Sequence, residues 1–149
     1  MQESAFQQIS RGIIARYPLI YIHGWEEARI EKTLSQVSEK HYLDNRPVIT
    51  WTAGKGFYNN EGSIEDIKDP VAAIDYISNS DNSSFYLLKD LPAFLEHNLL
   101  LERALRDLYQ QNKSKDTYVF FSYPQLQLPD SLKKEAVSYT HLRAHETGV

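Results

Sequence analysis

The hydrophobic pattern centres on a short apolar run, Phe85 to Leu88, that ends in Lys89 and Asp90 and is followed closely by Pro92. Four apolar side chains without polar alternation predict a strand that is buried on both faces, as in a parallel sheet covered by helices. Functional residues of such sheets gather at the carboxyl ends of the strands. We therefore expect Lys89 and Asp90 to lie where an open α/β fold places its site.

Three further segments rich in β-branched, aliphatic and aromatic residues predict strands, and helical patterns separate them. Strands that alternate with helices predict a doubly wound α/β sheet with right-handed crossovers. Residues 53–69, with three glycines and mixed charge, indicate a long connection. The expected strands are 17–22, 47–52, 85–88 and 116–122, and the expected helices are 5–14, 25–41, 70–77 (capped by Asp69) and 99–111, with a further helix near Asp130.

Composition narrows the class of protein. The chain has 149 residues, of which 42% are hydrophobic, and this is the size of one domain. Its 16 basic and 20 acidic residues give a net charge of −4, which offers no general attraction to nucleic acid or to an anionic membrane. The absence of cysteine excludes disulfides, thiolate metal sites and cysteine nucleophiles. Because no apolar run reaches about 18 residues and no signal peptide is visible, we expect a cytoplasmic protein.

The last twelve residues, 138–149, match none of these patterns. Their run from Ser138 to Thr147 resembles the translation of a sequencing adapter, so we exclude this tail from the expected fold as non-native. We expect the natural gene product to continue beyond about Val137, which makes residues 1–137 a fragment of a longer protein. His141 and His145 lie in the tail and are not offered as a metal pair.

The turn after the first expected strand lacks the phosphate-binding pattern G-x-x-x-x-G-K-[ST]. It contains one glycine, Gly24, and it places Glu26 and Glu27 where phosphates would lie. Carboxylates at the amino end of a helix are stabilised by the helix dipole, but they repel phosphate. The sequence therefore argues against phosphate binding at this turn.

Three other polar residues lie at or near the ends of expected strands. Lys55, between two glycines after the second strand, could contact an anionic partner or belong to a flexible loop. Asp90 has the position of a Walker B carboxylate, which holds Mg²⁺, although many buried strands end in a charge that reaches water. Ser122 has the position of a residue that senses the γ-phosphate in ATPases with an additional strand between the Walker elements. Together with Gly24, these three are our candidate cofactor-binding residues, and we assign no catalytic residue and no metal ligand.

Six segments form a recognisable set when they are taken in order: Ala15 to Ile22, Trp25 to Arg29, Trp51 to Phe57, Leu88 to Leu95, Arg103 to Leu108 and Leu128 to Leu132. Together they resemble the N-terminal region of a family of AAA-type ATPases, the uncharacterised AAA proteins of cyanobacteria, other bacteria and algal plastids, named after a hypothetical chloroplast reading frame. The resemblance covers about residues 6–135 and implies an α/β, three-layer P-loop-NTPase-like domain with a mostly parallel sheet flanked by helices and with degenerate Walker motifs.

The resemblance implies that this domain precedes a separate AAA module, which carries the true Walker motifs and the arginine finger. Our leading hypothesis is a non-catalytic, ATPase-like domain that acts in assembly or partner binding. ATP and Mg²⁺ are implied only for the parent protein, whose expected partners are its own C-terminal AAA module and further copies of itself, without membrane or nucleic acid. A location in the plastid stroma follows if the source is an alga. Two alternatives stay open: weak binding of ATP and Mg²⁺ through Gly24, Lys55, Asp90 and Ser122, or a stand-alone α/β interaction module.

Overall fold

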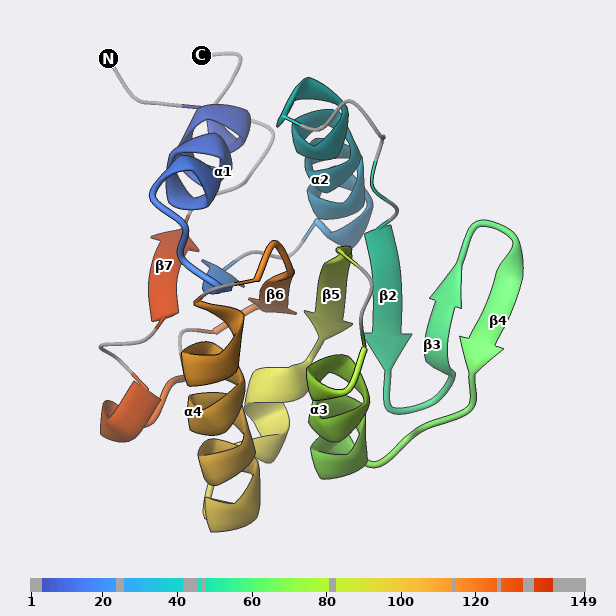
Figure 1. Cartoon of the computed structure of the whole chain (residues 1–149), viewed down its shortest axis with the longest axis vertical. Coiled ribbons are helices and arrows are strands. Elements are labelled where there is room, and N and C mark those ends of the chain that lie inside the picture. Colours follow the sequence, from blue (N-terminus) through green and yellow to red (C-terminus); the bar gives the residue numbers. More distant parts are fainter. Residues whose placement is uncertain are drawn as a thin grey trace.

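The computed structural model describes residues 4–23, 26–41, 46, 48–80, 83–113, 115–125, 127–132 and 136–140. Within these residues the chain forms three layers, with a sheet between two pairs of helices (Figure 1). Helices α1 (Ala5–Ile14) and α2 (Glu27–His41) cover one face of the sheet, and α3 (Pro70–Ser78) and α4 (Leu99–Asn112) cover the other. The expected three-layer α/β class is confirmed. None of the described helices has the length and apolar composition needed to cross a bilayer.

The described strands form one seven-stranded sheet in the order β4-β3-β2-β5-β6-β1-β7. Neighbouring strands in the part β2-β5-β6-β1-β7 are all parallel. Strands β3 and β4 extend the sheet beyond β2 with antiparallel pairing. Strand β6 lies between β1 and β5, as expected for the strand that ends in Ser122. The bounds are β1 (Leu19–His23), β2 (Val48–Thr52), β3 (Gly56–Asn59), β4 (Gly62–Glu65), β5 (Phe85–Lys89), β6 (Tyr118–Tyr123) and β7 (Ala136–Thr140).

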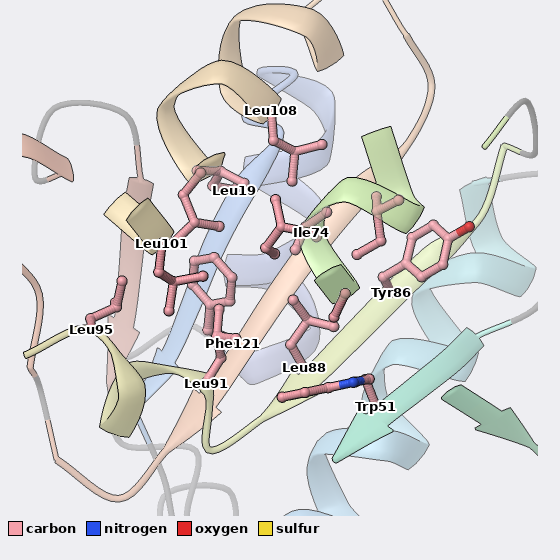
Figure 2. Packing of buried hydrophobic residues seen from close by; sticks show 14 of the residues in the cluster. Leu19, Trp51, Ile74, Tyr86, Leu88, Leu91, Leu95, Leu101, Leu108 and Phe121 are labelled. Atoms are coloured by element: carbon pink, nitrogen blue, oxygen red, sulfur yellow. The ribbon is translucent and has the colours of Figure 1, made fainter. Parts of the chain in front are cut away.

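Strand β5 supplies both hydrophobic cores, because all five of its residues are buried and successive side chains point to opposite faces. Tyr86 and Leu88 pack among the buried residues under α3 and α4, which Figure 2 shows with Trp51 and Phe121. Phe85 and Leu87 pack in the second core, under α1 and α2. The prediction of a strand buried on both faces is confirmed.

Side-chain caps begin three of the helices. The Ser4 hydroxyl accepts from the Gln7 backbone N–H at 3.2 Å, and the Gln7 side chain accepts from the Ser4 N–H, which forms a capping box. The predicted cap of α3 is confirmed, because the Asp69 carboxylate accepts from the Ala72 N–H at 2.9 Å. Asn98 caps α4 in the same way. These local bonds place the helix starts where the sequence signals them.

The interpretation of residues 53–69 as a long connection was wrong. They contain the hairpin of β3 and β4, which extends the sheet beyond β2. The Phe57 ring is fully buried and lies 4.7 Å from the Tyr76 ring, between centroids. The glycines that suggested a loop instead serve the hairpin, since Gly56 has a φ of +74° and lies against the Glu65 backbone.

The carboxyl-terminal part of the fold also differs from expectation. Near Asp130 the structure has a 3₁₀ turn, η2 (Asp130–Leu132), in place of the expected helix start. Strand β7 then pairs with β1 in parallel, and it includes Ser138, Tyr139 and Thr140 from the tail that we excluded from the fold. That exclusion was wrong as a statement about secondary structure, whereas the non-native origin of the tail stays a prediction.

An ionic contact ties the amino ends of two strands that are separated by β5. Arg46, before β2, donates from Nη2 to Asp116 Oδ2 at 2.9 Å and from Nη1 to the Asp116 carbonyl oxygen. Arg16, after α1, lies 3.4 Å from the other carboxylate oxygen. The hydrogen bond from Arg46 is the main cause of a lowered pKa of Asp116. The pairing therefore stabilises the folded state only while Asp116 is ionised.

We expect Asp116→Asn to lower the free energy of unfolding at pH 7 by about 1 kcal/mol, a value that allows for screening of a partly exposed carboxylate. Because the pKa of Asp116 is lower in the folded state, the contribution is complete above its unfolded pKa of about 3.9 and is lost as the pH falls through the folded value. Urea unfolding of both proteins between pH 7 and pH 2 measures this, and the two curves should converge in acid. Asp66→Asn, which removes an exposed pair with Lys68, is the control and should change little. A difference that persists at the lowest pH would contradict the ionic explanation.

The hairpin gives a second prediction. A Cβ at Gly56 would lie 2.5 Å from the Glu65 carbonyl oxygen, whereas a Cβ at Gly54 meets nothing within 4 Å. We expect Gly56→Ala to destabilise the domain by about 2 kcal/mol through steric overlap and positive φ, and Gly54→Ala by less than about 0.5 kcal/mol. Thermal unfolding of the two variants measures the difference. Equal stability of the two would show that the hairpin does not need its glycine.

Candidate functional site

The carboxyl ends of β5 and β6 bring two of the candidate residues together. The Asp90 backbone N–H donates to the Ser122 carbonyl oxygen at 2.8 Å. Ser122 is the register partner of Lys89 in the parallel pair, so these two side chains point to the same face of the sheet, the one covered by α2. The Ser122 side chain is buried, while Asp90 is exposed.

Lys89 forms a cluster of ion pairs with two glutamates at this end of the described sheet. Its side chain is 9% exposed, and its Nζ lies 3.3 Å from Glu27 Oε1 and 3.4 Å from Glu31 Oε2. The two glutamates are four residues apart on α2 and so share one side of that helix. Burial disfavours the charged ammonium, but Glu31, Tyr58 and Glu27 outweigh that effect and raise the pKa of Lys89. The ammonium is therefore charged and paired at neutral pH.

The ion cluster joins the end of β5 to the first turn of α2, and in chain order these two elements correspond to the metal-binding strand and the phosphate-binding helix of a P-loop NTPase. In that arrangement the helix after the first strand directs its amino end at phosphate, and the neighbouring strand supplies an acidic residue for Mg²⁺. Here Glu27 is in the first turn of α2, and the strand ends in a lysine that contacts it. A phosphate at the end of α2 would meet carboxylates, and a metal ion near β5 would meet an ammonium. The geometry suits an internal ion cluster better than a nucleotide site.

Asp90 lies beside this cluster in a backbone conformation that is uncommon for residues other than glycine. Its φ is 62° and its ψ is 13°, in the left-handed region, just before the 3₁₀ turn η1 (Leu91–Phe94). Partial desolvation and the negative charge of Glu27 raise the pKa of Asp90, against the opposing effect of Lys89. Among the residues that the structure describes, no group of three acidic or histidine side chains is placed to hold a metal ion.

Of the other two candidates, Lys55 is described, and no contact joins it to Asp90 or Ser122 among the described residues. Lys55 lies in the turn between β2 and β3, where its Nζ is 5.3 Å from the centroid of the Tyr58 ring. Tyr58 faces the α2 side, because it is the register partner of Thr50. Lys55 thus reaches the same layer as Lys89, with an aromatic ring as its contact. Gly24 lies outside the described residues.

Sequence reasoning placed Lys89 beside Asp90 at the expected site but left it out of the candidate cofactor-binding residues. A signal existed, since a lysine that directly follows four buried residues needs an acidic partner. Glu27 and Glu31, with their helical spacing, are such partners, but the sequence does not show that α2 lies over the end of β5.

Comparison with known proteins gives concordant results. The curated protein named Uncharacterized AAA domain-containing protein ycf46 of Guillardia theta is 28% identical over 130 residues, which are 85% of this chain and 25% of that protein. Its namesake in Trieres chinensis is 29% identical over 126 residues, or 80% of this chain and 24% of that protein. The chain thus spans about a quarter of the length of these relatives.

A chain in the solved structure of Drosophila ORC bound to DNA covers 97% of this chain, with 93% of its own length, at 12% identity and a TM-score of 0.49. A similarity at that level adds nothing to a functional argument. The family model described as the N-terminal domain of SpoVK-like AAA ATPases matches residues 5–141, which include all four helices described above and both hydrophobic cores. This match over most of the chain agrees with a P-loop-NTPase-like fold, and the chain belongs to the family of SpoVK-like AAA ATPase N-terminal domains.

Proposed function

We propose that this chain is a non-catalytic, ATPase-like domain that serves assembly or partner binding within a longer AAA-type ATPase. The observation that carries the proposal is the ion cluster that the buried Lys89 forms with the partly exposed Glu27 and Glu31 beside the first turn of α2. Family membership supplies the parent class. A domain that keeps the fold but fills this place with its own side chains can bind partners through its surface without carrying out catalysis.

The energy of the ion cluster supports this reading. For a nucleotide to bind in the usual place, Lys89 would have to leave Glu27 and Glu31. Glu27 and Glu31 are 53% and 40% exposed, so separating these pairs costs only about 1 kcal/mol after solvent screening. Binding of ATP at 1 mM affinity is worth about 4 kcal/mol. The cost of separating the pairs therefore weakens nucleotide binding without cancelling it, and the carboxylates of Glu27 and Glu31, which repel phosphate, oppose binding further.

The alternative is weak binding of ATP and Mg²⁺ at the strand ends. It is favoured by the exposed Asp90, its backbone bond to Ser122, and the position of Lys55 in the same layer. In our proposal ATP and Mg²⁺ instead belong to the separate AAA module of the parent, and that module and further copies of the parent are the partners. A cytoplasmic location, or a stromal one in an alga, is part of the same proposal.

Calorimetric titration of the 149-residue chain with ATP and Mg²⁺ separates the two functions. We expect no binding tighter than about 1 mM, for the wild type and for Asp90→Ala alike. Both proteins must show the same far-ultraviolet circular dichroism, so that misfolding does not imitate a lack of binding. Tighter binding by the wild type that disappears in Asp90→Ala would overturn the proposal and make Asp90 a ligand residue.

Lys89→Met tests the structural role of the ion cluster. The variant keeps the length of the side chain but leaves Glu27 and Glu31 without their cation; because both carboxylates are partly exposed, we expect a loss of about 1 kcal/mol in the free energy of unfolding at pH 7. Adding Glu27→Gln and Glu31→Gln to Lys89→Met should recover much of that loss, because no unpaired charge remains. Urea unfolding measures all three proteins, with Lys55→Met as a control that should change stability by less than about 0.5 kcal/mol. Unchanged stability of Lys89→Met would contradict the role assigned to the cluster.

A further inference from the structure

One groove of the domain lies between α2 and the β3–β4 hairpin, and we call it the acidic groove. Its volume is about 470 Å³, and its lining includes Glu31, Glu39 and Glu61. Its floor includes Val48 and Tyr58, both partly exposed. The one cation in its lining is Arg46, which is held by Asp116. The groove exists because α2 packs over β2 and β5 and leaves the hairpin beyond them uncovered on this face.

A second groove, which we call the basic groove, lies between α1 and the carboxyl end of α2. Its volume is about 380 Å³, and its charged lining residues are Arg11 and Lys40, with no acidic residue. Phe6 and Ile14 contribute apolar surface, and the Ile14 side chain is 69% exposed, which is unusual for an isoleucine in a helix that packs on a core.

The basic groove also contains polar atoms that lack partners. Ser10 is 8% exposed, yet neither its Oγ nor His41 Nε2 has a hydrogen-bond partner among the described residues. Both residues line this groove. Buried polar groups are nearly always paired in proteins. Both atoms are enclosed by the domain itself, so they add buried polarity to the wall of the basic groove and no contact for an occupant.

The two grooves lie in the same helical layer, on either side of α2, whose residues line both of them. Helix α1 lies near β7 at one end of the strand order, and the hairpin forms the other end (Figure 1). Each groove combines an apolar part with charges of one sign, and the signs are opposite. Surfaces of this kind on one molecule are complementary to each other in two copies.

We propose that the occupant of each groove is a second copy of this domain, with α1 of one copy docked in the acidic groove of the next. Arg11 and Lys40 then face Glu39 and Glu61, while Phe6 and Ile14 cover Val48 and Tyr58. The interface is heterologous, so repetition yields a ring if the rotation closes and an open filament if it does not. This inference rests on the proposed assembly function and names its surfaces.

Sedimentation velocity of the 149-residue chain between about 5 and 500 µM tests the interface. This range is chosen because complexes with a small interface form at such concentrations. We expect the weight-average sedimentation coefficient of the wild type to rise with concentration. Arg11→Glu/Lys40→Glu and Glu39→Lys/Glu61→Lys should each weaken self-association by tenfold or more. Mixed in equal amounts, the two variants should associate again, because the native basic groove of one meets the native acidic groove of the other.

The matched control is Arg103→Glu/Arg106→Glu, which makes the same change of charge on α4, in the opposite layer. It should associate like the wild type. All of these side chains are exposed, so thermal unfolding should show folded variants. A wild type that stays monomeric throughout the range overturns the inference. Association that neither charge reversal weakens overturns this interface but leaves the assembly function standing, and nucleotide titration tests that function separately.

Discussion

Strand β5 has no exposed face, and this constraint shapes the rest of the domain. Its apolar residues are enclosed by helices on both sides, so the charge at its end cannot simply turn to water. Lys89 instead reaches the carboxylates of Glu27 and Glu31, which lie on the helix packed above it. A buried ammonium is tolerated only when it is paired and hydrogen-bonded. The position of α2 over the end of β5 and the charge at that end are therefore coupled.

The same coupling bears on our proposal that this domain keeps the fold of P-loop NTPases without their chemistry. The layers and the parallel core of the sheet are kept, including the strand placed between β1 and β5. In a nucleotide-binding domain, the end of the helix after β1 must stay open to phosphate. Here carboxylates occupy that helix end and an ammonium faces them. Fold and function have different requirements, and a few side chains at the strand ends are enough to separate them.

The β3–β4 hairpin shapes the surface of the domain on the side of α1 and α2. It extends the sheet past the last helix of the α1–α2 layer, and it leaves a groove whose walls carry acidic side chains. At the other end of the layer, α1 presents exposed apolar and basic side chains. In a sheet that is mostly covered, these are the places on this layer where a neighbouring molecule can add cover. A role in assembly would use the parts of the fold that catalysis does not need.

Much of the secondary structure follows from local sequence. The run from Phe85 to Leu88, the cap at Asp69 and the helical stripe of α4 all depend on neighbours in the chain, so their patterns predict them well. The lack of a P-loop pattern after β1 and the resemblance to AAA proteins are also properties of the sequence. The hairpin was missed because its glycines resemble those of a loop, and β7 was missed because its segment was set aside as a tail.

The site could not be derived in the same way. Asp90 and Ser122 were expected at neighbouring strand ends and are joined there by one backbone hydrogen bond. The partners of Lys89 come from a helix far away in the sequence, and the choice among several glutamates depends on how α2 is placed over the sheet. Thus the sequence by itself determined the class of fold and the absence of the phosphate-binding sequence pattern after β1, since both depend on short-range pattern. Only the tertiary structure decided which charges meet, because ion pairing over a sheet depends on packing of elements that the chain connects at long range.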